Sequence, residues 1–319
     1  MLTCQKPIVV VGSVNLDFVT TADHIPVAGE TIHGNQFQIH PGGKGANQAV
    51  AVARLGYPVE MIGKIGSDLP GEQLRTHLQT AGVGLAGVEQ IEGASGTAVI
   101  LVARNGENCI VVTPGANAHV SPAYVDRHVN LIRKAGLVLT QLEIPIETIE
   151  YLAEVCFREN VPLMLDPAPA QNLPSGLLKR VSWFTPNETE AAFYAGGDPG
   201  CGPETAPDVT ARWLLAQGPT GILLKMGSRG AYVAVDGMEE QLDAIPVNAI
   251  DTTAAGDAFN GAFAVGLMLG KTVRESARFA TAAAALSVTR SGAQPSMPTL
   301  QEVEQMLAKT AAESGKLIL

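Results

Sequence analysis

The sequence has few charged residues, few aromatic residues and no long apolar segment. Charged residues make up 16% of the 319 residues and aromatic residues 5%, whereas 46% are hydrophobic. This balance excludes an intrinsically disordered chain and is typical of a globular protein with a large buried core. No apolar run approaches the ~20 residues that a membrane-spanning helix requires, and no basic segment followed by a long apolar one opens the chain. We therefore expect a cytoplasmic protein with no membrane partner.

Cysteine and positive charge are scarce as well. The four cysteines form neither a C-x-x-C pair nor a zinc-like group with histidine; they are Cys4, Cys109, Cys156 and Cys201. We therefore expect reduced thiols, without a disulfide framework or a structural zinc site. The formal net charge of −10 argues against nucleic acid as a partner. No G-x-G-x-x-G follows the first strand-like run, residues 7–12, which argues against a nicotinamide dehydrogenase.

Strand-like and helix-like segments alternate through most of the chain. Four strand-like segments each end in polar or glycine-rich residues, and they cover residues 137–143, 162–167, 183–190 and 220–230. This alternation predicts an α/β fold with a doubly wound, mainly parallel sheet and helices on both faces. In such sheets, ligands bind at the carboxyl ends of the strands. One polar strand end can be a helix cap, but four in register favour a binding site.

Two hairpin-like excursions interrupt this alternation. One surrounds residues 34–35, with arms at residues 30–33 and 36–40, and the other surrounds residues 104–107. They predict a small separate sheet with strands within about residues 14–40 and 96–113, which is either a lid over a site or a dimer surface. No repeat, low-complexity tract or flexible linker divides the chain, so we expect a single domain over residues 1–319.

Two stretches near the N-terminus bring polar and small residues together. Asn15 and Asp17 share one face of a strand-like segment, because strand side chains alternate. That face is either a solvated edge or part of a polar pocket. Three glycines at positions 42, 43 and 45 surround Lys44 and precede Asn47. They form either a tight turn before a helix or a place where the backbone approaches a ligand closely.

The stretch of residues 251–261 combines small residues with an acid at a predicted helix start, and a strand-like run, residues 245–250, precedes it. The small residues are Ala254, Ala255 and Gly256. They would leave the first-turn N–H groups open, and those groups together with the helix dipole attract an anion. Asp257 beside a bound phosphate would be placed to take a proton from an attacking hydroxyl. These residues alone leave open an ordinary helix capped by Asp251 or Thr252.

Taken together, these features suit transfer of a phosphoryl group to an alcohol, because that reaction depends on positioning, a base and an anion site. Three motifs resemble the signatures of the ribokinase-like (PfkB) sugar kinases: residues 42–48 (GGKGANQ), 187–190 (NETE) and 251–257 (DTTAAGD). The resemblance covers nearly the whole chain, with the motifs in the family's order and spacing. It implies an α/β domain with a small β-sheet lid that also forms a homodimer.

The resemblance also implies a reaction. Such kinases transfer the γ-phosphate of ATP to the 5-hydroxyl of D-ribose, giving D-ribose 5-phosphate and ADP, with Mg²⁺ or another divalent cation and with K⁺ as an activator. A kinase for 2-deoxyribose, another furanose or a nucleoside is the alternative. Asn15 beside Asp17 would pair with vicinal hydroxyls, and a polar group left unpaired by a deoxy sugar costs about 1–3 kcal/mol, which favours ribose. A non-catalytic sugar sensor is disfavoured, because binding alone has no use for Asp257.

Residue by residue, the resemblance assigns four groups of positions. Those matching the sugar site are Asn15, Asp17, Gly43, Lys44, Gly45, Ala46, Asn47 and Glu143. Those matching the catalytic base and the anion hole are Asp257, Ala255 and Gly256. Those matching the ATP site are Asn187, Glu190, Lys225, Met226, Gly227, Ser228, Arg229, Gly230, Gly256 and Thr281, with Asn187 and Glu190 near the waters of Mg²⁺. Those matching the ligands of a monovalent cation, several through backbone carbonyls, are Asp251, Thr253, Ser287, Arg290, Gly292 and Ser296.

Two positions depart from the pattern of the family. Ala254 stands where Gly is common, and its N–H group is retained. Lys225 stands where Thr is common, so its ammonium either contacts a phosphate or faces solvent.

Overall fold

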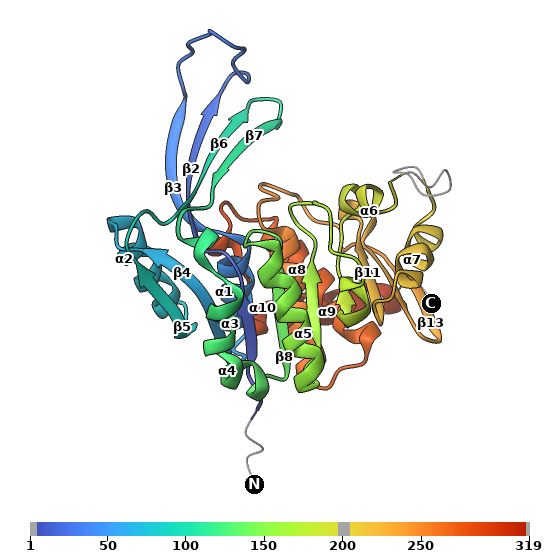
Figure 1. Ribbon diagram of the computed structural model, residues 1–319. Coiled ribbons are helices and arrows are strands. Elements are labelled where there is room, and N and C mark those ends of the chain that lie inside the picture. The colour runs from blue at the N-terminus through green and yellow to red at the C-terminus, as the bar shows by residue number, and fades with distance from the viewer. Residues whose placement is uncertain (1–4, 197–204, 317–319) are drawn as a thin grey trace.

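A nine-stranded, mainly parallel sheet runs through the centre of the protein (Figure 1). The computed structural model describes residues 5–196 and 205–316. In spatial order the strands are β13 (Met238–Leu242), β12 (Ala231–Val235), β11 (Gly221–Lys225), β10 (Trp183–Phe184), β9 (Leu163–Asp166), β8 (Leu137–Gln141), β1 (Ile8–Val11), β4 (Val59–Gly66) and β5 (Gly84–Ile91). Among these described strands, β12 alone is antiparallel to its neighbours. The predicted fold class is confirmed.

Continuous apolar runs explain why the central strands are buried on both faces. All four side chains of β1 are 0% exposed. Because strand side chains alternate, Ile8 and Val10 belong to one hydrophobic core, and Val9 and Val11 belong to the other. The sheet therefore separates two cores, and each core requires a layer of helices.

Ten α-helices in the described ranges supply these two layers. The helices that contribute to the core of Ile8 and Val10 are α1 (Lys44–Arg54), α2 (Leu69–Thr80), α8 (Ala255–Met268), α9 (Val273–Ser287) and α10 (Leu300–Lys316). Those that contribute to the core of Val9 and Val11 are α3 (Pro122–Arg127), α4 (Val129–Lys134), α5 (Ile146–Glu159), α6 (Glu188–Tyr194) and α7 (Pro207–Ala216). Figure 1 shows α5 in front of the sheet and α8 and α9 behind it.

A second, four-stranded sheet projects from the top of the body (Figure 1). Its strands in spatial order are β3 (Gln36–Gly42), β2 (Asn15–Ala22), β6 (Gly96–Ala103) and β7 (Asn108–Thr113). The predicted separate sheet and the predicted hairpin around residues 104–107 are confirmed, because β6 and β7 pair in antiparallel register.

The predicted hairpin around residues 34–35 is wrong in one arm. Residues 30–33 form no strand. Instead β3 pairs with β2, from Thr21 opposite Gln36 to Asn15 opposite Gly42. The Glu30 carboxylate accepts a hydrogen bond from the Val27 N–H, which holds the preceding residues in a turn. The apolar alternation of residues 36–40 therefore finds its partner in the longer β2 and not in its immediate neighbour.

The strand expected at residues 245–250 is also absent. Pro246 cannot donate to a ladder, and the Ile250 N–H bonds to the Val288 carbonyl at the end of α9. This extended segment instead borders a cavity, through residues 245–247 and 249.

Two smaller expectations concern thiols and membranes. Cys109 and Cys156 are free, whereas Cys4 and Cys201 lie outside the described residues. In the part of the chain that the structure describes, no helix has both the length and the apolar character needed to cross a membrane.

Candidate active site

The start of α8 carries unpaired backbone donors. Ala254 is the N-cap residue, with φ of 58°, and no side chain caps the helix. The Ala255 N–H bonds to the Thr252 carbonyl at 3.2 Å. Within the described structure, the N–H groups of Gly256 and Asp257 donate to no protein atom. Neither Asp251 nor Thr252 therefore caps this helix with its side chain. The open N–H groups are free to bind an anion.

Asp257 lies in the first turn of this helix and is 4% exposed. Its carboxylate accepts hydrogen bonds from Asn47 Nδ2 at 2.9 Å and from Gln48 Nε2 at 3.0 Å. Burial raises its pKa to about 6, although the nearby Lys44 ammonium opposes the rise. A carboxylate with this pKa is ionised at neutral pH and still basic enough to accept a proton in a transition state.

The sugar-site positions converge where β2 meets α1. Gly43 has φ of 86°, and a Cβ atom there would lie 2.7 Å from the Asn15 nitrogen, so the turn requires glycine. The Lys44 N–H donates to the Glu143 carboxylate at 3.0 Å. Burial, together with the nearby carboxylates of Glu143 and Asp257, raises the pKa of Asp17 to about 7, although the Lys44 ammonium opposes the rise. The structure therefore places the acids Asp17, Glu143 and Asp257 close enough to interact through their charges.

The backbone N–H groups of two predicted sugar-site residues, Gly45 and Ala46, bond to Ser13. The Gly45 N–H donates to Ser13 Oγ at 3.3 Å, and the Ala46 N–H donates to the Ser13 carbonyl at 2.9 Å. A Cβ atom on Gly45 would lie 2.6 Å from the Ser13 nitrogen. These contacts dock the helix against the end of β1.

Asn15 has a partner that the sequence did not suggest. It is 2% exposed, and its Oδ1 accepts a hydrogen bond from Asn117 Nδ2 at 2.7 Å. This contact fixes the direction of the amide beside Asp17. Asn117 lies in a short turn about 100 residues further along the chain, and no local pattern marks it.

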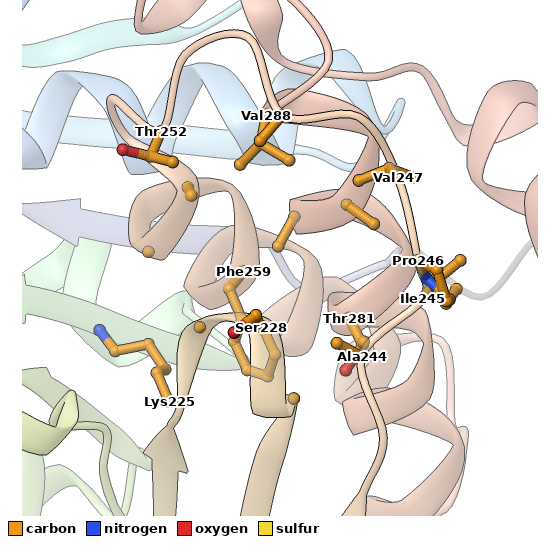
Figure 2. A pocket seen from close by; sticks show the side chains of 17 residues that line it. Lys225, Ser228, Ala244, Ile245, Pro246, Val247, Thr252, Phe259, Thr281 and Val288 are labelled. Atoms are coloured by element: carbon orange, nitrogen blue, oxygen red, sulfur yellow. The ribbon is translucent and has the colours of Figure 1, made fainter. Parts of the chain in front are cut away.

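A cavity of about 510 Å³ opens beside the start of α8 (Figure 2). Seven predicted residues line it: Lys225, Gly227, Ser228, Gly230, Ala255, Gly256 and Thr281. Met226 is instead buried in the core. Arg229 is exposed and forms an ion pair with Glu188. The Thr281 hydroxyl donates to the Ala277 carbonyl at 2.9 Å.

The rest of the cavity wall is apolar and was not predicted. It consists of Ala244, Ile245, Pro246, Val247, Ala249, Phe259, Ala284, Ala285 and Val288, with Thr252 beside them. In Figure 2, Lys225 lies at one end of the cavity and Pro246 at the other. Helical spacing could have indicated some of these residues, since Phe259 is four residues after Ala255 and Ala285 four after Thr281.

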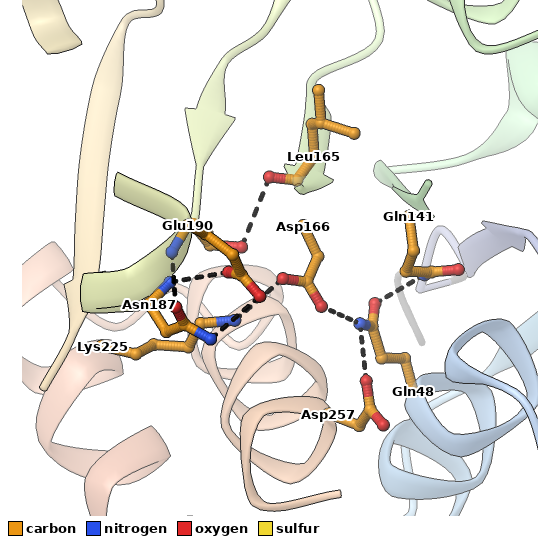
Figure 3. A network of polar contacts seen from close by, with 9 residues as sticks. Gln48, Gln141, Leu165, Asp166, Asn187, Glu190, Lys225 and Asp257 are labelled. Atoms are coloured by element: carbon orange, nitrogen blue, oxygen red, sulfur yellow. Dashed lines mark hydrogen bonds and ion pairs between the residues drawn. The ribbon is translucent and has the colours of Figure 1, made fainter. Parts of the chain in front are cut away.

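A buried polar network joins this cavity to Asp257 (Figure 3). Gln48 Nε2 donates both to Asp257 Oδ1 and to Asp166 Oδ2, at 3.0 and 2.9 Å. Lys225 Nζ lies 2.8 Å from Asp166 Oδ1. Gln141 Nε2 donates to Gln48 Oε1 at 2.7 Å. The sequence did not predict roles for Gln48, Gln141 and Asp166, although Asp166 ends a strand and was therefore visible as a strand-end acid.

Asn187 and Glu190 form the capping box of α6. Asn187 Oδ1 accepts from the Glu190 N–H, and a Glu190 carboxylate oxygen accepts from the Asn187 N–H, both at 2.8 Å. Burial raises the pKa of Glu190; the Lys225 ammonium opposes this rise and the Asp166 carboxylate adds to it. Both predicted residues thus lie beside the network of Figure 3, and the cap orients them.

The predicted cation positions gather between two loops. Asp251 accepts from the Thr253 N–H at 2.9 Å and from the Gly292 N–H at 2.8 Å. The hydroxyls of Ser287 and Ser296 donate to the carbonyls of Ala284 and Ala293, and Arg290 pairs with Glu302. Among the described residues, no three His, Cys, Asp or Glu side chains form a group that could hold a metal ion.

Comparison with known proteins places this geometry in a family. The sequence pattern of the family described as "pfkB family carbohydrate kinase" matches residues 5–300. The chain belongs to the pfkB family of carbohydrate kinases. It is 42% identical over 305 residues to the ribokinase of Bacillus subtilis (strain 168), covering 95% of this chain and 100% of that protein.

Other pfkB-family relatives bear on the substrate. The chain is 35% identical over 306 residues to a deoxyribokinase of Salmonella typhi, covering 94% of this chain and 98% of that protein. The solved structure of Arabidopsis thaliana ribokinase complexed with ribose and ATP is similar, with a TM-score of 0.87 and 36% identity over 95% of this chain and 98% of that one. The family makes this chain an ATP-dependent sugar kinase.

Proposed function

We propose that this protein transfers the γ-phosphate of ATP to the 5-hydroxyl of D-ribose, giving D-ribose 5-phosphate and ADP. One observation carries the proposal: the buried Asp257 carboxylate adjoins unpaired N–H groups at the start of α8, with a nucleotide-sized cavity beside that helix start and the polar side chains of Asn47 and Gln48 bonded to the carboxylate. A relative with 42% identity over its full length is a ribokinase.

The residues divide between two substrates. On the sugar side, Asp17, Asn15 and Glu143 accept or donate hydrogen bonds to hydroxyl groups, and Lys44 and Asn47 complete the pocket. Asp257 takes the proton from the 5-hydroxyl as that oxygen attacks phosphorus. The unpaired N–H groups of Gly256 and Asp257 at the helix start would stabilise the charge on the transferred phosphoryl group, because the helix holds these donors in place before the reaction begins.

On the nucleotide side, the cavity has one polar and one apolar end. The turn from Lys225 to Gly230 holds the phosphates near Gly256, and the apolar residues 245–247 with Thr281 enclose the base. The enclosed apolar end suits a purine ring, because it removes apolar surface from water.

We further propose that a hydrated divalent cation binds beside Asn187, Glu190 and Asp166. Buried carboxylates suit Mg²⁺, which keeps several waters and binds through one or two acids. Burial raises the pKa of Glu190 and the Asp166 carboxylate adds to the rise, and a bound cation would favour the ionised form of both acids. When bound, Mg²⁺ neutralises charge on the phosphates of ATP.

A monovalent cation, K⁺, is proposed for the region between Asp251 and Gly292. The serine hydroxyls there donate their hydrogens to carbonyls. The lone pairs of the hydroxyl oxygens and of the loop carbonyl oxygens would therefore be the ligands of the cation. The hydrogen bonds to Asp251 fasten the two loops to each other. Such a cation would fix the loop that precedes the open N–H groups.

The small sheet is proposed as a lid and as a dimer surface within a single domain of residues 1–319. Exposed apolar side chains on this sheet support the proposal, because such surfaces commonly mark interaction sites. Each is at least 45% exposed, and they are Phe37, Ile39, Val99, Ile110, Val111 and Val112. The partner would be a second copy of this chain. A cytoplasmic location stays a prediction.

The proposal is tested by measuring ADP release with ATP and a panel of D-ribose, 2-deoxy-D-ribose, D-fructose and nucleosides. We expect the highest kcat/KM with D-ribose and at least a tenfold lower value with 2-deoxy-D-ribose, because the deoxy sugar leaves a buried polar group unpaired. A preference for 2-deoxy-D-ribose would support the alternative, a 2-deoxyribose kinase. The relative from Salmonella typhi is a deoxyribokinase. ADP release with none of the sugars would contradict the proposal.

A further inference from the structure

Lys225 connects the nucleotide cavity to the buried network. It is the last residue of β11, its side chain is 12% exposed, and its Nζ lies 2.8 Å from Asp166 Oδ1. It does not face solvent, although the sequence left that open. The same side chain lines the cavity, where a Cβ atom built on Gly256 would lie 3.5 Å from its Nζ. The ammonium therefore lies next to the unpaired N–H groups of the helix start.

Carboxylates outnumber ammonium groups around Lys225, so a negatively charged ligand depends on the few ammonium groups that can reach it. Five carboxylates surround the polar pocket and the network, namely Asp17, Glu143, Asp166, Glu190 and Asp257, and two ammonium groups, Lys44 and Lys225, face them. A triphosphate adds further negative charge. The Lys225 ammonium lines the nucleotide cavity, whereas Lys44 begins α1 beside Glu143.

The ion pair fixes the ammonium without saturating it. An ammonium has three donors, and the described structure shows one partner for Lys225, the Asp166 carboxylate. The other oxygen of Asp166 accepts from Gln48, which also donates to Asp257. The Asp166 carboxylate and the Gln48 amide therefore link the Lys225 ammonium to the Asp257 carboxylate. This link fixes the separation of the two charged groups before any substrate binds.

We propose that Lys225 is a catalytic residue whose ammonium donates hydrogen bonds to the phosphoryl group during transfer, while Asp166 holds it in position. This inference rests on the proposed function. The sugar oxygen bonds to the γ-phosphorus, the bond from that phosphorus to the β,γ-bridging oxygen breaks, and ADP leaves with the bonding electrons as Asp257 accepts the hydroxyl proton. Lys225 makes and breaks no covalent bond. It neutralises charge that spreads over the γ-phosphoryl and bridging oxygens.

The test compares binding of two nucleotides by calorimetry, without sugar and with Mg²⁺ present. AMP-PNP carries the β- and γ-phosphates and AMP carries neither. We expect Lys225→Met to weaken AMP-PNP binding at least tenfold and AMP binding less than threefold, because one charge-assisted hydrogen bond to the γ-phosphate is lost. Lys225→Arg, which retains the charge, should recover most of the AMP-PNP affinity. Turnover of D-ribose by Lys225→Met should fall in kcat as well as in kcat/KM for ATP.

Lys64→Met is the matched control. Lys64 is also a nearly buried lysine in an ion pair, with a side chain 10% exposed and Nζ 3.3 Å from Glu89, but it does not line the cavity. We expect Lys64→Met to leave the ratio of AMP-PNP to AMP affinity unchanged. If Lys225→Met does not fold, Lys225→Thr supplies the same comparison.

Three results would overturn the inference. They are an unchanged AMP-PNP affinity in Lys225→Met, an equal loss of AMP-PNP and AMP affinity, and the same selective loss in Lys64→Met. The nucleotide measurements do not depend on the sugar. A wild-type protein that prefers AMP-PNP to AMP and phosphorylates no sugar would therefore contradict the proposed function and leave standing the assignment of Lys225 to the β- and γ-phosphate end of the nucleotide.

Discussion

At the scale of single residues, the proposed chemistry depends on one buried carboxylate and the amides that hold it. Asp257 has two side-chain donors, Asn47 and Gln48, and a nearby ammonium from Lys44. Burial favours its protonated form, whereas these three partners favour the carboxylate. The balance between them sets the pH at which a base at this position works.

Replacing Asp257 by Asn should separate binding from turnover. Asn is nearly isosteric, and its one carbonyl oxygen can still accept from either Asn47 or Gln48, but it cannot accept the hydroxyl proton. We expect kcat to fall by about 10²–10⁴-fold with the affinities for D-ribose and AMP-PNP changed little. Steady-state kinetics and calorimetry measure the two effects. Asp236→Asn, on an exposed loop, is the control, and a near-wild-type kcat in Asp257→Asn would remove this residue from the role of base.

The pH dependence follows from the raised pKa of Asp257. Because its pKa is about 6 and the base must be ionised, kcat should rise with pH up to about 6 and level off above it. Below that pH it should fall about tenfold per unit, as protonation removes the base. Gln48→Met removes a donor that favours the carboxylate, so the acidic limb should move to higher pH.

A pH–rate profile of kcat for wild type, Gln48→Met and the exposed control Gln79→Met measures this shift. The same acidic limb in Gln48→Met and in wild type would show that Gln48 does not control the base.

At the scale of elements, the start of α8 carries backbone strain that keeps its donors open. Ala254 adopts a left-handed conformation with φ of 58°, which disfavours a residue with a Cβ atom. The conformation turns the chain into the helix without a side-chain cap.

Ala254→Gly should therefore stabilise the protein by about 0.5–1 kcal/mol, since relief of the left-handed strain exceeds the entropy that glycine gains when unfolded. Ala258→Gly, in the regular part of the same helix, should destabilise it by about 1 kcal/mol or more, because glycine is a poor helix former. Urea unfolding of both variants gives the comparison. Destabilisation by Ala254→Gly would mean that its methyl group makes packing contacts that outweigh the strain.

The two loops joined by Asp251 should make activity depend on K⁺. At fixed Mg²⁺ we expect turnover to increase as K⁺ replaces Na⁺, because a bound cation fixes the loop that precedes the open N–H groups. Asp251→Asn weakens the hydrogen bonds to Thr253 and Gly292 and should reduce the activation. Indifference to K⁺ throughout such a titration would contradict the cation assignment.

At the scale of the whole molecule, the small sheet exposes a group of large apolar side chains. Val111 is 61% exposed and Phe37 also 61%, although both lie in strands. A sheet face of this kind is expected to pack against another surface. A second copy of this chain is the partner that the resemblance to other sugar kinases predicted.

Val111→Lys should convert the proposed dimer to a monomer, because it places a charge in the proposed apolar contact. Sedimentation velocity measures the change. Val209→Lys, at a 41% exposed valine on α7, should leave the dimer intact. A wild-type chain that sediments as a monomer would contradict the proposed dimer at the outset.

The sequence by itself determined the fold class, because the alternation of apolar strands and helices has few packing solutions. It also indicated the main motifs: the glycine turn at Gly43, the helix start at Ala255 and the acid at Asp257, which we propose as the base, are local patterns that can be recognised without knowing what lies across the sheet. It failed at residues 30–33 and 245–250, where apolar alternation resembled a strand and no neighbouring strand was available to pair with it.

Only the tertiary structure decided which distant residues meet. Gln48, Asp166 and Lys225 come from α1, β9 and β11, and their contacts span 59 and 118 residues of sequence. Periodicity says which face a side chain takes, but the order of strands in the sheet decides which neighbour it finds there. The parallel sheet brings the carboxyl ends of β9 and β11 to one edge and packs α1 and α8 above it, and that arrangement turns separate polar residues into one site.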